Sequence, residues 1–438
     1  MGLKTCKFGG TSVADAGQLR KVKAIIEADP ERRFVVPSAP GKRTPDDVKV
    51  TDMLYDCHER GTAGEPIDKA FGPIRVRYEE IIADLGLKLD LTPHLDEVSK
   101  RLAAGAGADY AASRGEYLNG FLVADLLGFE YIDAADIVHF DAHGRFDAEK
   151  TQDSVSKRLS GATRAVIPGF YGALPDGSIK TFSRGGTDIS GAIVARATGS
   201  DVYENWTDVS GLLMADPRVV EKPRTIEVLT YRELRELAYM GATVLHDEAI
   251  FPVREAGIPV HIRNTDTPDR EGTKIIREMG DTRPSGEITG IAGRKDFTII
   301  ALEKTLMNAE IGFGRRLLGV LEKNGVSWEH MPSGIDTLSI VIKDSELGDK
   351  LETLIGEIRE ACQPDSIERY SNIALIATVG RGMMSIPGMA GRLFGALAAA
   401  GVNVRMIDQG SSELNIIVGV DAADFEKATR AIYDAFAA

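Results

Sequence analysis

Short apolar runs alternate with longer helical patterns through about the first 265 residues of the chain. The apolar runs are rich in β-branched and aromatic residues, and clear examples are residues 34–36, 165–167 and 202–206. Strands that alternate with helices predict a mostly parallel sheet covered by helices on both faces. The segment 264–287 is polar and rich in turn residues, so we place the end of this first domain, residues 1–280, within it.

The pattern changes after this border, where the chain contains an internal repeat. Residues 317–326 (LLGVLEKNGV) align with residues 393–402 (LFGALAAAGV) at an offset of 76 (393 minus 317). The apolar runs 338–342 and 414–418 keep the same offset. Each copy has the order strand, helix, turn, two strands and helix, which predicts two small α+β modules of the βαββαβ type. We assign them to residues 288–365 and 366–438.

Composition narrows the classes of function. The chain has 438 residues and a formal net charge of −14, which disfavours nucleic acid as a partner because a phosphate backbone requires a basic surface. Cys6, Cys57 and Cys362 are widely spaced and form no CxxC pair, so we expect neither a disulfide framework nor a zinc site. No apolar stretch has the length of a membrane span or a signal peptide. These features favour a cytoplasmic protein that acts on small molecules.

Candidate chemistry begins at residues 7–12 (KFGGTS), where the first apolar run gives way to a helical pattern. A cation, two glycines and hydroxyl residues suit a strand-to-helix turn that binds phosphate, although a glycine pair is also common in ordinary turns. The lysine precedes the glycines, so this is not a Walker loop. Residues 183–188 (SRGGTD) repeat the design before another helical pattern. Two such turns in one domain suit the two ends of a polyphosphate.

These motifs and their order resemble those of the aspartate kinase family, and the similarity spans nearly the whole chain. The matching segments are KFGGTSV at 7–13, SRGGTD at 183–188, WTDVSGLLMADPRVV at 206–220, GATVLHDEA at 241–249 and SSELN at 411–415. The resemblance implies an amino-acid kinase domain, a three-layer αβα sandwich, followed by two ACT-like domains, with the option that one is inserted within the other. It also implies ATP and Mg²⁺ as cofactors and L-aspartate as the substrate.

The resemblance implies a role for each residue of the phosphoryl-transfer site. Lys7 stabilises the transferring phosphoryl group, with the backbone amides of Gly9 and Gly10 beside it. Asp188 either orients Lys7 or shares a substrate contact. No residue is assigned to a protein metal site, because the seven histidines show no metal-ligand spacing.

Free aspartate carries two carboxylates and an ammonium, and the resemblance assigns a partner to each kind of charge. Arg184 binds a carboxylate through its two parallel N–H groups, and Glu116 binds the ammonium. Ser38 and Thr51 supply hydroxyl contacts. For Thr51 an ordinary helix N-cap is an alternative role. Thr44 is a rival for the substrate contact, because it lies in the segment 42–49, which is longer and more charged than the usual short loop.

Nucleotide contacts are implied for Ser12, Thr207, Asp208 and Arg218. Thr243 departs from the family pattern, because many relatives carry a nucleotide-binding lysine there. The cations considered as substitutes are Arg218, Lys222 and Arg263. We interpret His246, which lies on an apolar helical pattern, as a packed histidine rather than a catalytic base.

The repeated modules contain no catalytic constellation, so we expect them to regulate the enzyme by binding an amino acid, lysine or threonine or both. The matching region of the first module contains Met307, Gly312, Phe313 and Glu329. Residues 309–310 differ from the polar pair of lysine-sensitive relatives. The alternative is that the modules only join subunits, and a homodimer or homotetramer through them is expected.

Two rival functions remain open at this stage. One is a related kinase that acts on glutamate or N-acetylglutamate. The other is an amino-acid-binding regulator with a decayed kinase domain, which the departure at Thr243 keeps open.

Overall fold

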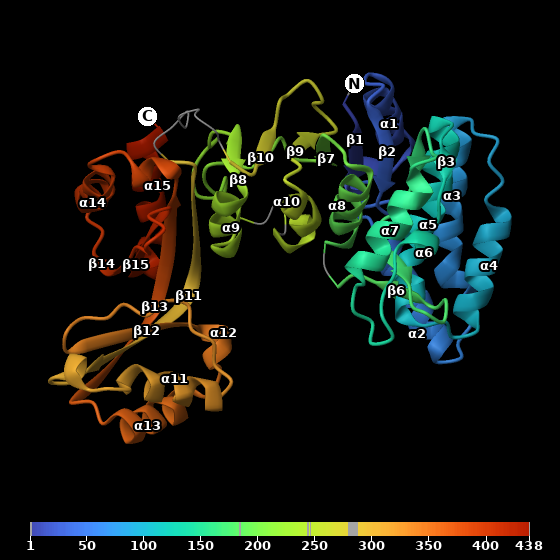
Figure 1. Ribbon diagram of the computed structural model, residues 1–438. Coiled ribbons are helices and arrows are strands. Elements are labelled where there is room, and N and C mark those ends of the chain that lie inside the picture. The colour runs from blue at the N-terminus through green and yellow to red at the C-terminus, as the bar shows by residue number, and fades with distance from the viewer. Residues whose placement is uncertain (1, 184, 243–244, 246, 279–287, 438) are drawn as a thin grey trace. The chain divides into compact units, whose positions relative to one another are not determined.

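The computed structural model describes residues 2–183, 185–242, 245, 247–278 and 288–437 (Figure 1). The chain forms two compact units. Unit 1 comprises Met1–Leu212, Thr225–Tyr231 and Val244–Gly280, and unit 2 comprises Leu213–Arg224, Arg232–Thr243 and Asp281–Ala438. Two short segments that precede the predicted border, 213–224 and 232–243, therefore pack with the C-terminal part of the chain. The predicted domain boundaries, 1–280, 288–365 and 366–438, stay predictions.

Unit 1 is built on an eight-stranded sheet in the order β3-β4-β2-β1-β7-β9-β10-β8. Every neighbouring pair is parallel except β9 and β10, so the predicted mostly parallel sheet is confirmed. The strands are β1 (Lys4–Phe8), β2 (Arg32–Pro37), β3 (Glu130–Tyr131), β4 (Ala165–Val166), β7 (Val202–Thr207), β8 (Val228–Thr230), β9 (Val260–Asn264) and β10 (Thr273–Ile276). A separate hairpin joins β5 (Tyr171–Ala173) to β6 (Ile179–Thr181).

Helices cover both faces of this sheet, which confirms the three-layer sandwich (Figure 1). Cys6, Phe8 and Val35 share one buried cluster with α1 (Ala16–Glu27), α2 (Val50–Thr62), α3 (Asp68–Leu85), α4 (Thr92–Ala103) and α5 (Ala108–Leu127). Phe34 and Val36 lie in a second cluster with α6 (Ala134–Ile137), α7 (Ala148–Leu159) and α8 (Gly186–Thr198). Successive residues of a strand point to opposite faces. Lys7, between Cys6 and Phe8, therefore points to the face that α8 covers.

Unit 2 has a five-stranded antiparallel sheet in the order β12-β11-β13-β15-β14. Its strands are β11 (Gly290–Glu303), β12 (Thr337–Lys343), β13 (Ser366–Val379), β14 (Val404–Asp408) and β15 (Asn415–Asp421). Its helices are α9 (Tyr231–Tyr239), α11 (Phe313–Lys323), α12 (Asp344–Leu347), α13 (Leu351–Cys362), α14 (Met389–Ala399) and α15 (Phe425–Ala437). α10 (Phe251–Ala256) belongs to unit 1.

The repeat in the sequence is a repeat in the structure with the same offset. β13 begins 76 residues after β11 (366 minus 290), and α14 begins 76 residues after α11 (389 minus 313). The glycines that precede the two helices, Gly312 and Gly388, both adopt the left-handed conformation, at φ 84° and 91°. β11 and β13 are long enough to pass through both modules. Residues 290–294 pair with 375–379, and residues 299–303 pair with 366–370, on either side of a register shift.

In the described part of the chain, no helix is both long enough and apolar enough to cross a membrane. The three cysteines are buried free thiols.

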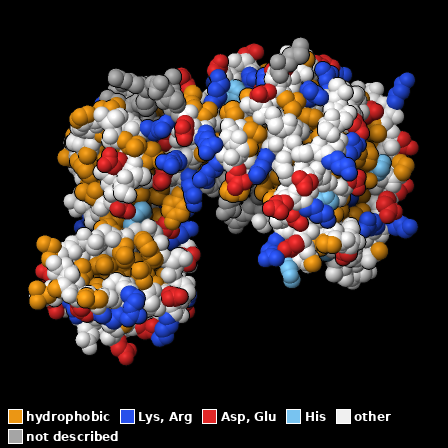
Figure 2. Space-filling model, in the orientation of Figure 1, with side chains coloured by type: hydrophobic (Ala, Val, Ile, Leu, Met, Phe, Trp, Pro, Cys, Tyr) orange, Lys and Arg blue, Asp and Glu red, His pale blue; other side chains and the backbone are white. Residues whose placement is uncertain are grey.

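Figure 2 shows hydrophobic side chains gathered on one face of the module that contains α11 and β12. Large exposed apolar side chains of this module are Leu306, Ile311, Trp328 and Ile335.

Candidate active site

Lys7 lies at the centre of unit 1 because β1 pairs with β7 in a register that puts it opposite Asn205. Both side chains are buried and lie on the face covered by α8. Asp188, in the first turn of α8, meets them there. Lys7 Nζ lies 2.6 Å from Asp188 Oδ1 and donates to Asn205 Oδ1 at 3.3 Å. The contact with Lys7 that one of the two expected roles of Asp188 requires is therefore present.

The glycine turn after β1 brings backbone close to this ammonium. The amide of Gly9 donates to the carbonyl of Trp206 at 3.0 Å, and a Cβ on Gly9 would lie 3.6 Å from Lys7 Nζ. Gly10 accepts a hydrogen bond from the amide of Gly41 at 2.9 Å. A Cβ on Gly41 would lie 2.6 Å from the carbonyl carbon of Gly10, so only glycine allows these two loops to meet. The KFGG loop (residues 7–10) and the PSAPG loop (residues 37–41) therefore form one continuous backbone surface beside Lys7.

Glu116 approaches the PSAPG loop from α5. Its carboxyl is buried and accepts a hydrogen bond from the backbone of Ala39, while its Oε2 has no hydrogen-bond partner among the described residues. Burial raises the pKa of Glu116 to about 7, against smaller opposing effects of the backbone hydrogen bonds and Arg114. Ser38 is fixed by its backbone, since its carbonyl accepts from Asn119 Nδ2 at 2.7 Å. An unpartnered buried carboxylate oxygen is chemically suited to a cationic group of a ligand.

The two hydroxyl candidates near this loop differ in their positions. Thr51 lies in the first turn of α2, but the N-cap of this helix is Lys49, so the alternative capping role for Thr51 is wrong. Thr44 is exposed in the preceding loop. This loop is held by Arg77, which donates to the carbonyl of Gly41 at 3.2 Å and pairs with Asp47 at 2.8 Å.

The second glycine turn is packed as tightly as the first. Gly185 adopts the left-handed conformation at φ 57° before α8, and a Cβ on Gly186 would lie 2.2 Å from the ring of Phe170. This packing fixes the start of α8 and hence Asp188. Arg184, Thr243 and His246 lie outside the described residues.

The residues expected to contact nucleotide fall into two groups. Thr207 is the last residue of β7 and Asp208 follows it, and the Thr207 hydroxyl donates to Asp208 Oδ1 at 3.1 Å. Ser12 is buried, and its hydroxyl accepts from Thr265 at 2.7 Å, so it ties the first glycine turn to the end of β9. Arg218 belongs to unit 2, where it pairs with Asp216 at 2.6 Å.

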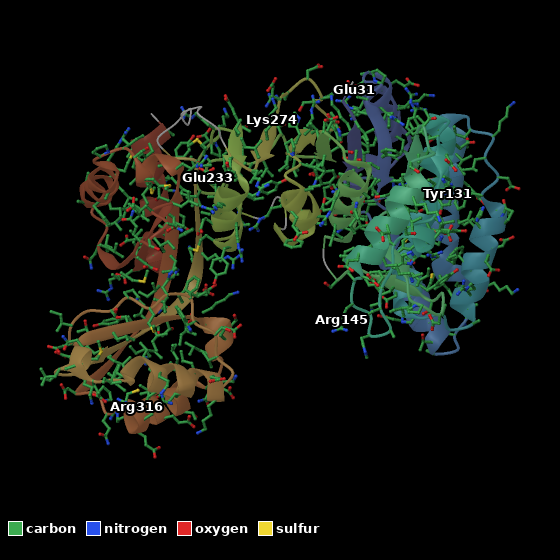
Figure 3. All side chains as sticks on the ribbon, viewed as in Figure 1. Glu31, Tyr131, Arg145, Glu233, Lys274 and Arg316 are labelled. Atoms are coloured by element: carbon green, nitrogen blue, oxygen red, sulfur yellow. The ribbon has the colours of Figure 1, made fainter. Side chains whose placement is uncertain are left out.

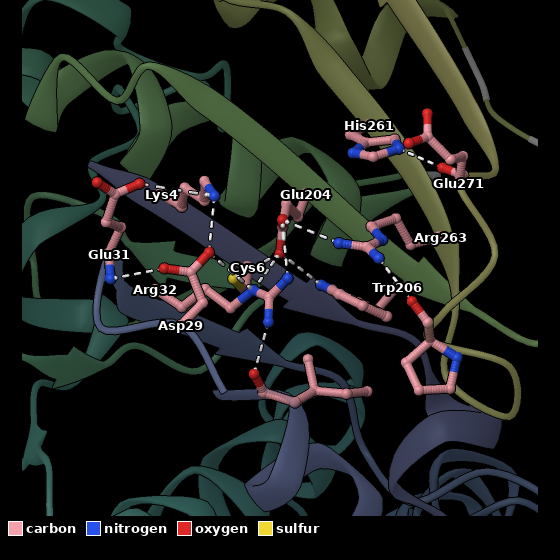
Figure 4. Close-up of polar contacts among 12 residues, drawn as sticks. Lys4, Cys6, Asp29, Glu31, Arg32, Glu204, Trp206, His261, Arg263 and Glu271 are labelled. Carbon is pink, nitrogen blue, oxygen red and sulfur yellow. Dashed lines mark hydrogen bonds and ion pairs between the residues drawn. The ribbon is translucent and has the colours of Figure 1, made fainter. Parts of the chain in front are cut away.

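A buried ionic cluster occupies the opposite face of the same strands (Figure 4). Glu204 accepts from Arg32 Nε at 2.8 Å and from the indole of Trp206 at 2.9 Å, and it lies 3.6 Å from Arg263. Cys6 donates to the same carboxylate at 3.4 Å. Burial alone would raise the pKa of Glu204, but the hydrogen bonds and charge of Arg32 outweigh it and the pKa is lowered. This cluster ties β1, β2, β7 and β9 together behind the site.

Arg263 is therefore unsuited to replace a nucleotide-binding lysine at position 243. Its guanidinium stacks on Trp206 at 4.6 Å from the ring centre and donates to the carbonyl of Pro268 at 2.6 Å. Of the three cations considered, Arg218 and Lys222 remain.

Sequence reasoning missed Asn205, Asn119 and Gly41. Asn205 adjoins the recognised WTD segment, but only the pairing of β1 with β7 shows that its amide reaches Lys7. Within the described part of the chain, no cluster of three or more His, Cys, Asp or Glu side chains has the geometry of a metal site.

Comparison with known proteins identifies the family. The amino acid kinase family matches residues 4–264, and an ACT domain matches residues 376–436. Aspartokinase 3 of Bacillus subtilis (strain 168) is 38% identical over 449 residues, which cover 99% of this chain and 98% of the relative. The crystal structure of Clostridium acetobutylicum aspartate kinase is 52% identical and superposes with a TM-score of 0.93, covering 99% of this chain and 100% of that one.

The fold is also shared with Escherichia coli aspartokinase III, solved in complex with aspartate and ADP. That structure is 24% identical, has a TM-score of 0.73 and covers 99% of both chains. The family match over more than half of the chain, and the full-length similarity to the Bacillus enzyme, show that this chain belongs to the aspartate kinase family, as a kinase with ACT regulatory domains.

Proposed function

We propose that Lys7 is the cation that neutralises the transferring phosphoryl group when unit 1 phosphorylates the side-chain carboxylate of L-aspartate. The observation that carries this proposal is the buried Lys7–Asp188 pair beside the Gly9–Gly10 turn. A side-chain carboxylate has a pKa of about 3.9 and is ionised at neutral pH, so the reaction requires no protein base. The barrier lies in bringing this anion to another anion. Positioning and charge neutralisation supply most of the catalysis in such transfers.

The substrate pocket is proposed to lie between α5 and the PSAPG loop. Glu116 Oε2, which is buried without a partner, binds the substrate ammonium. Ser38 and Thr51 supply hydroxyl contacts, and Arg184 binds a carboxylate through its fork of N–H groups. These assignments follow the residues that match the family motifs.

The nucleotide is proposed to bind as its magnesium complex at the ends of β1 and β7. Thr207 and Asp208 contact the nucleoside. The amide of Gly10, with Ser12 behind it, contacts phosphate, whereas Gly9, whose amide is bound to the Trp206 carbonyl, lets the phosphate approach the backbone. Magnesium bound with the nucleotide would neutralise part of the phosphate charge. Arg218 is proposed as a further phosphate contact.

Regulation is proposed to act through two connections within unit 2. The hydroxyl of Tyr239, on α9, donates to Glu329, one of the four residues proposed for the effector site with Met307, Gly312 and Phe313. Glu233, on the same helix and labelled in Figure 3, accepts from Thr289 at 2.6 Å. α9 thus joins the proposed effector module to the long strands of the sheet.

The second connection holds the segment 213–224, which contains Arg218. Its Met214 carbonyl accepts from the amide of Ile291 on β11 at 2.6 Å. Its Arg224 amide donates to the Tyr433 hydroxyl on α15 at 2.9 Å. A change in the ACT-like modules would therefore reach the segment that contains Arg218. We propose lysine, threonine or both as effectors, and E. coli aspartokinase III has been solved with lysine and aspartate.

A homodimer or homotetramer through these modules is part of the same proposal. The support is the set of large apolar side chains exposed on the first module, of which Ile311 is 97% exposed. Solvent-exposed apolar patches commonly mark subunit interfaces.

The role of Lys7 is tested by Lys7→Ala, with Lys4→Ala as the control on the same strand. Lys4 pairs with Asp29 at 2.7 Å, away from the proposed site. Loss of one preorganised charge typically lowers turnover by about 10²–10³-fold or more. We expect kcat to fall by at least this factor in Lys7→Ala, with the KM for aspartate within a few-fold, and little change in Lys4→Ala. Near-normal turnover in Lys7→Ala, measured by coupled ADP release, contradicts the assignment.

The role of Glu116 predicts a pH dependence of substrate binding. Only the carboxylate form attracts an ammonium, and the pKa of Glu116 is about 7 in the free protein. The ionised fraction therefore rises about tenfold between pH 6 and pH 8, and the KM for aspartate should fall by a similar factor. Glu116→Gln, which keeps the size and loses the charge, should have a high KM that does not vary with pH. The proposal fails if the wild-type KM is flat over this range or if Glu116→Gln retains the wild-type value.

The regulatory proposal is tested by measuring activity and calorimetric binding with lysine, threonine and methionine, singly and in pairs. Allosteric coupling is typically about 1–3 kcal/mol, so the effector should inhibit by about 5- to 150-fold. Glu329→Ala should weaken effector binding. Tyr433→Phe, which loses the hydrogen bond to Arg224, should leave effector binding intact and reduce the inhibition.

Tyr370→Phe is the matched control, because the Tyr370 hydroxyl donates to Glu368 on the surface of β13. If no amino acid binds or inhibits, the modules only join subunits. If Tyr433→Phe and Tyr370→Phe are inhibited equally well, the segment 213–224 does not transmit the signal.

A further inference from the structure

Asn205 is a buried amide that contacts both members of the Lys7–Asp188 pair. Its Nδ2 donates to Asp188 Oδ1 at 2.8 Å, and its Oδ1 accepts from Lys7 Nζ at 3.3 Å. It is 4% exposed. The three side chains thus form a closed triangle, and each member contacts the other two.

Only one orientation of the Asn205 amide satisfies both Lys7 and Asp188. An ionised carboxylate only accepts hydrogen bonds, and an ammonium only donates them. An amide offers one accepting oxygen and one donating nitrogen, so it satisfies both neighbours at once. Leucine would satisfy neither of them, and an aspartate would place a second carboxylate beside Asp188.

The pairing of the strands fixes the position of the Asn205 amide. Asn205 lies opposite Lys7 in the parallel register of β1 and β7. Its neighbours Glu204 and Trp206 point to the other face, where the Arg32 ion pair holds them. The strand therefore has little freedom to move the amide away from Lys7.

Lysine has three N–H donors, and two of those of Lys7 are directed to Asp188 and Asn205. The structure records no third partner among the described residues, and Gly9 lies next to the ammonium. Fixing two donors fixes the direction of the third, which points away from the pair. The neutral amide does this without adding negative charge that would weaken the cation.

We propose that Asn205 is a positioning residue for phosphoryl transfer, which orients the Lys7 ammonium and the Asp188 carboxylate and preserves the net positive charge of Lys7. This inference rests on the proposed role of Lys7. It predicts an effect on turnover rather than on substrate binding, because the amide nitrogen and oxygen of Asn205 are bound to Asp188 and Lys7.

The test compares Asn205→Ala and Asn205→Asp with Tyr203→Phe. Tyr203 lies on the same strand and the same face, and its hydroxyl donates to the backbone carbonyl of Asp188 at 3.0 Å. Misplacement of a reacting group by about 1 Å can cost about 10²-fold in rate. We expect kcat to fall about 10- to 100-fold in Asn205→Ala and further in Asn205→Asp, with both KM values within about threefold. Tyr203→Phe should stay within about threefold of the wild type.

A double variant separates this inference from the proposed function. If Asn205 acts through Lys7, adding Asn205→Ala to Lys7→Ala should lower kcat no further than Lys7→Ala alone. An active Lys7→Ala overturns the proposed function itself. An inactive Lys7→Ala beside a fully active Asn205→Ala overturns only the role of Asn205. Asn205→Ser, which retains a hydroxyl, should recover part of kcat, and circular dichroism at the assay temperature verifies that each variant is folded.

Discussion

The parallel, in-register pairing of β1 with β7 is the constraint on which the site depends. It places Lys7 opposite Asn205 and Phe8 opposite Trp206, and it lets the Gly9 amide continue the ladder to the Trp206 carbonyl. Because side chains alternate along a strand, the same pairing separates two kinds of chemistry. A shift of one residue in the register of either strand would move its side chains to the opposite face of the sheet.

Charged groups are paired differently on the two faces of the sheet in unit 1. Behind the sheet, Glu204 is bound by Arg32, Trp206, Cys6 and Arg263, so its charge is balanced and its contacts are structural. On the α8 face and beside α5, donors and acceptors are left free: Lys7 has a spare N–H direction and Glu116 Oε2 has no partner among the described residues. Buried polar groups without partners are expensive in free energy, which is why they indicate a ligand site.

Much of this structure was predictable from the sequence, because glycine turns, alternation and repeats are local patterns. The offset of 76 in the repeat reappears in the strands and helices, and the glycine turns lie where Gly9, Gly10, Gly185 and Gly186 predicted them. Asn205 was not predictable, since its role depends on which strand pairs with β1. The association of segments 213–224 and 232–243 with unit 2 was also missed, because hydrogen bonds such as Arg224 to Tyr433 join residues far apart in the chain.

The most direct test of the central claim is a crystal structure with ADP, Mg²⁺, aspartate and a planar phosphoryl mimic such as aluminium fluoride. We predict that Lys7 Nζ lies about 2.7–2.9 Å from the mimic, a normal distance for a charge-assisted hydrogen bond, while it keeps its contacts with Asp188 and Asn205. A complex in which the mimic is bound by other cations and Lys7 contacts only Asp188 would contradict it.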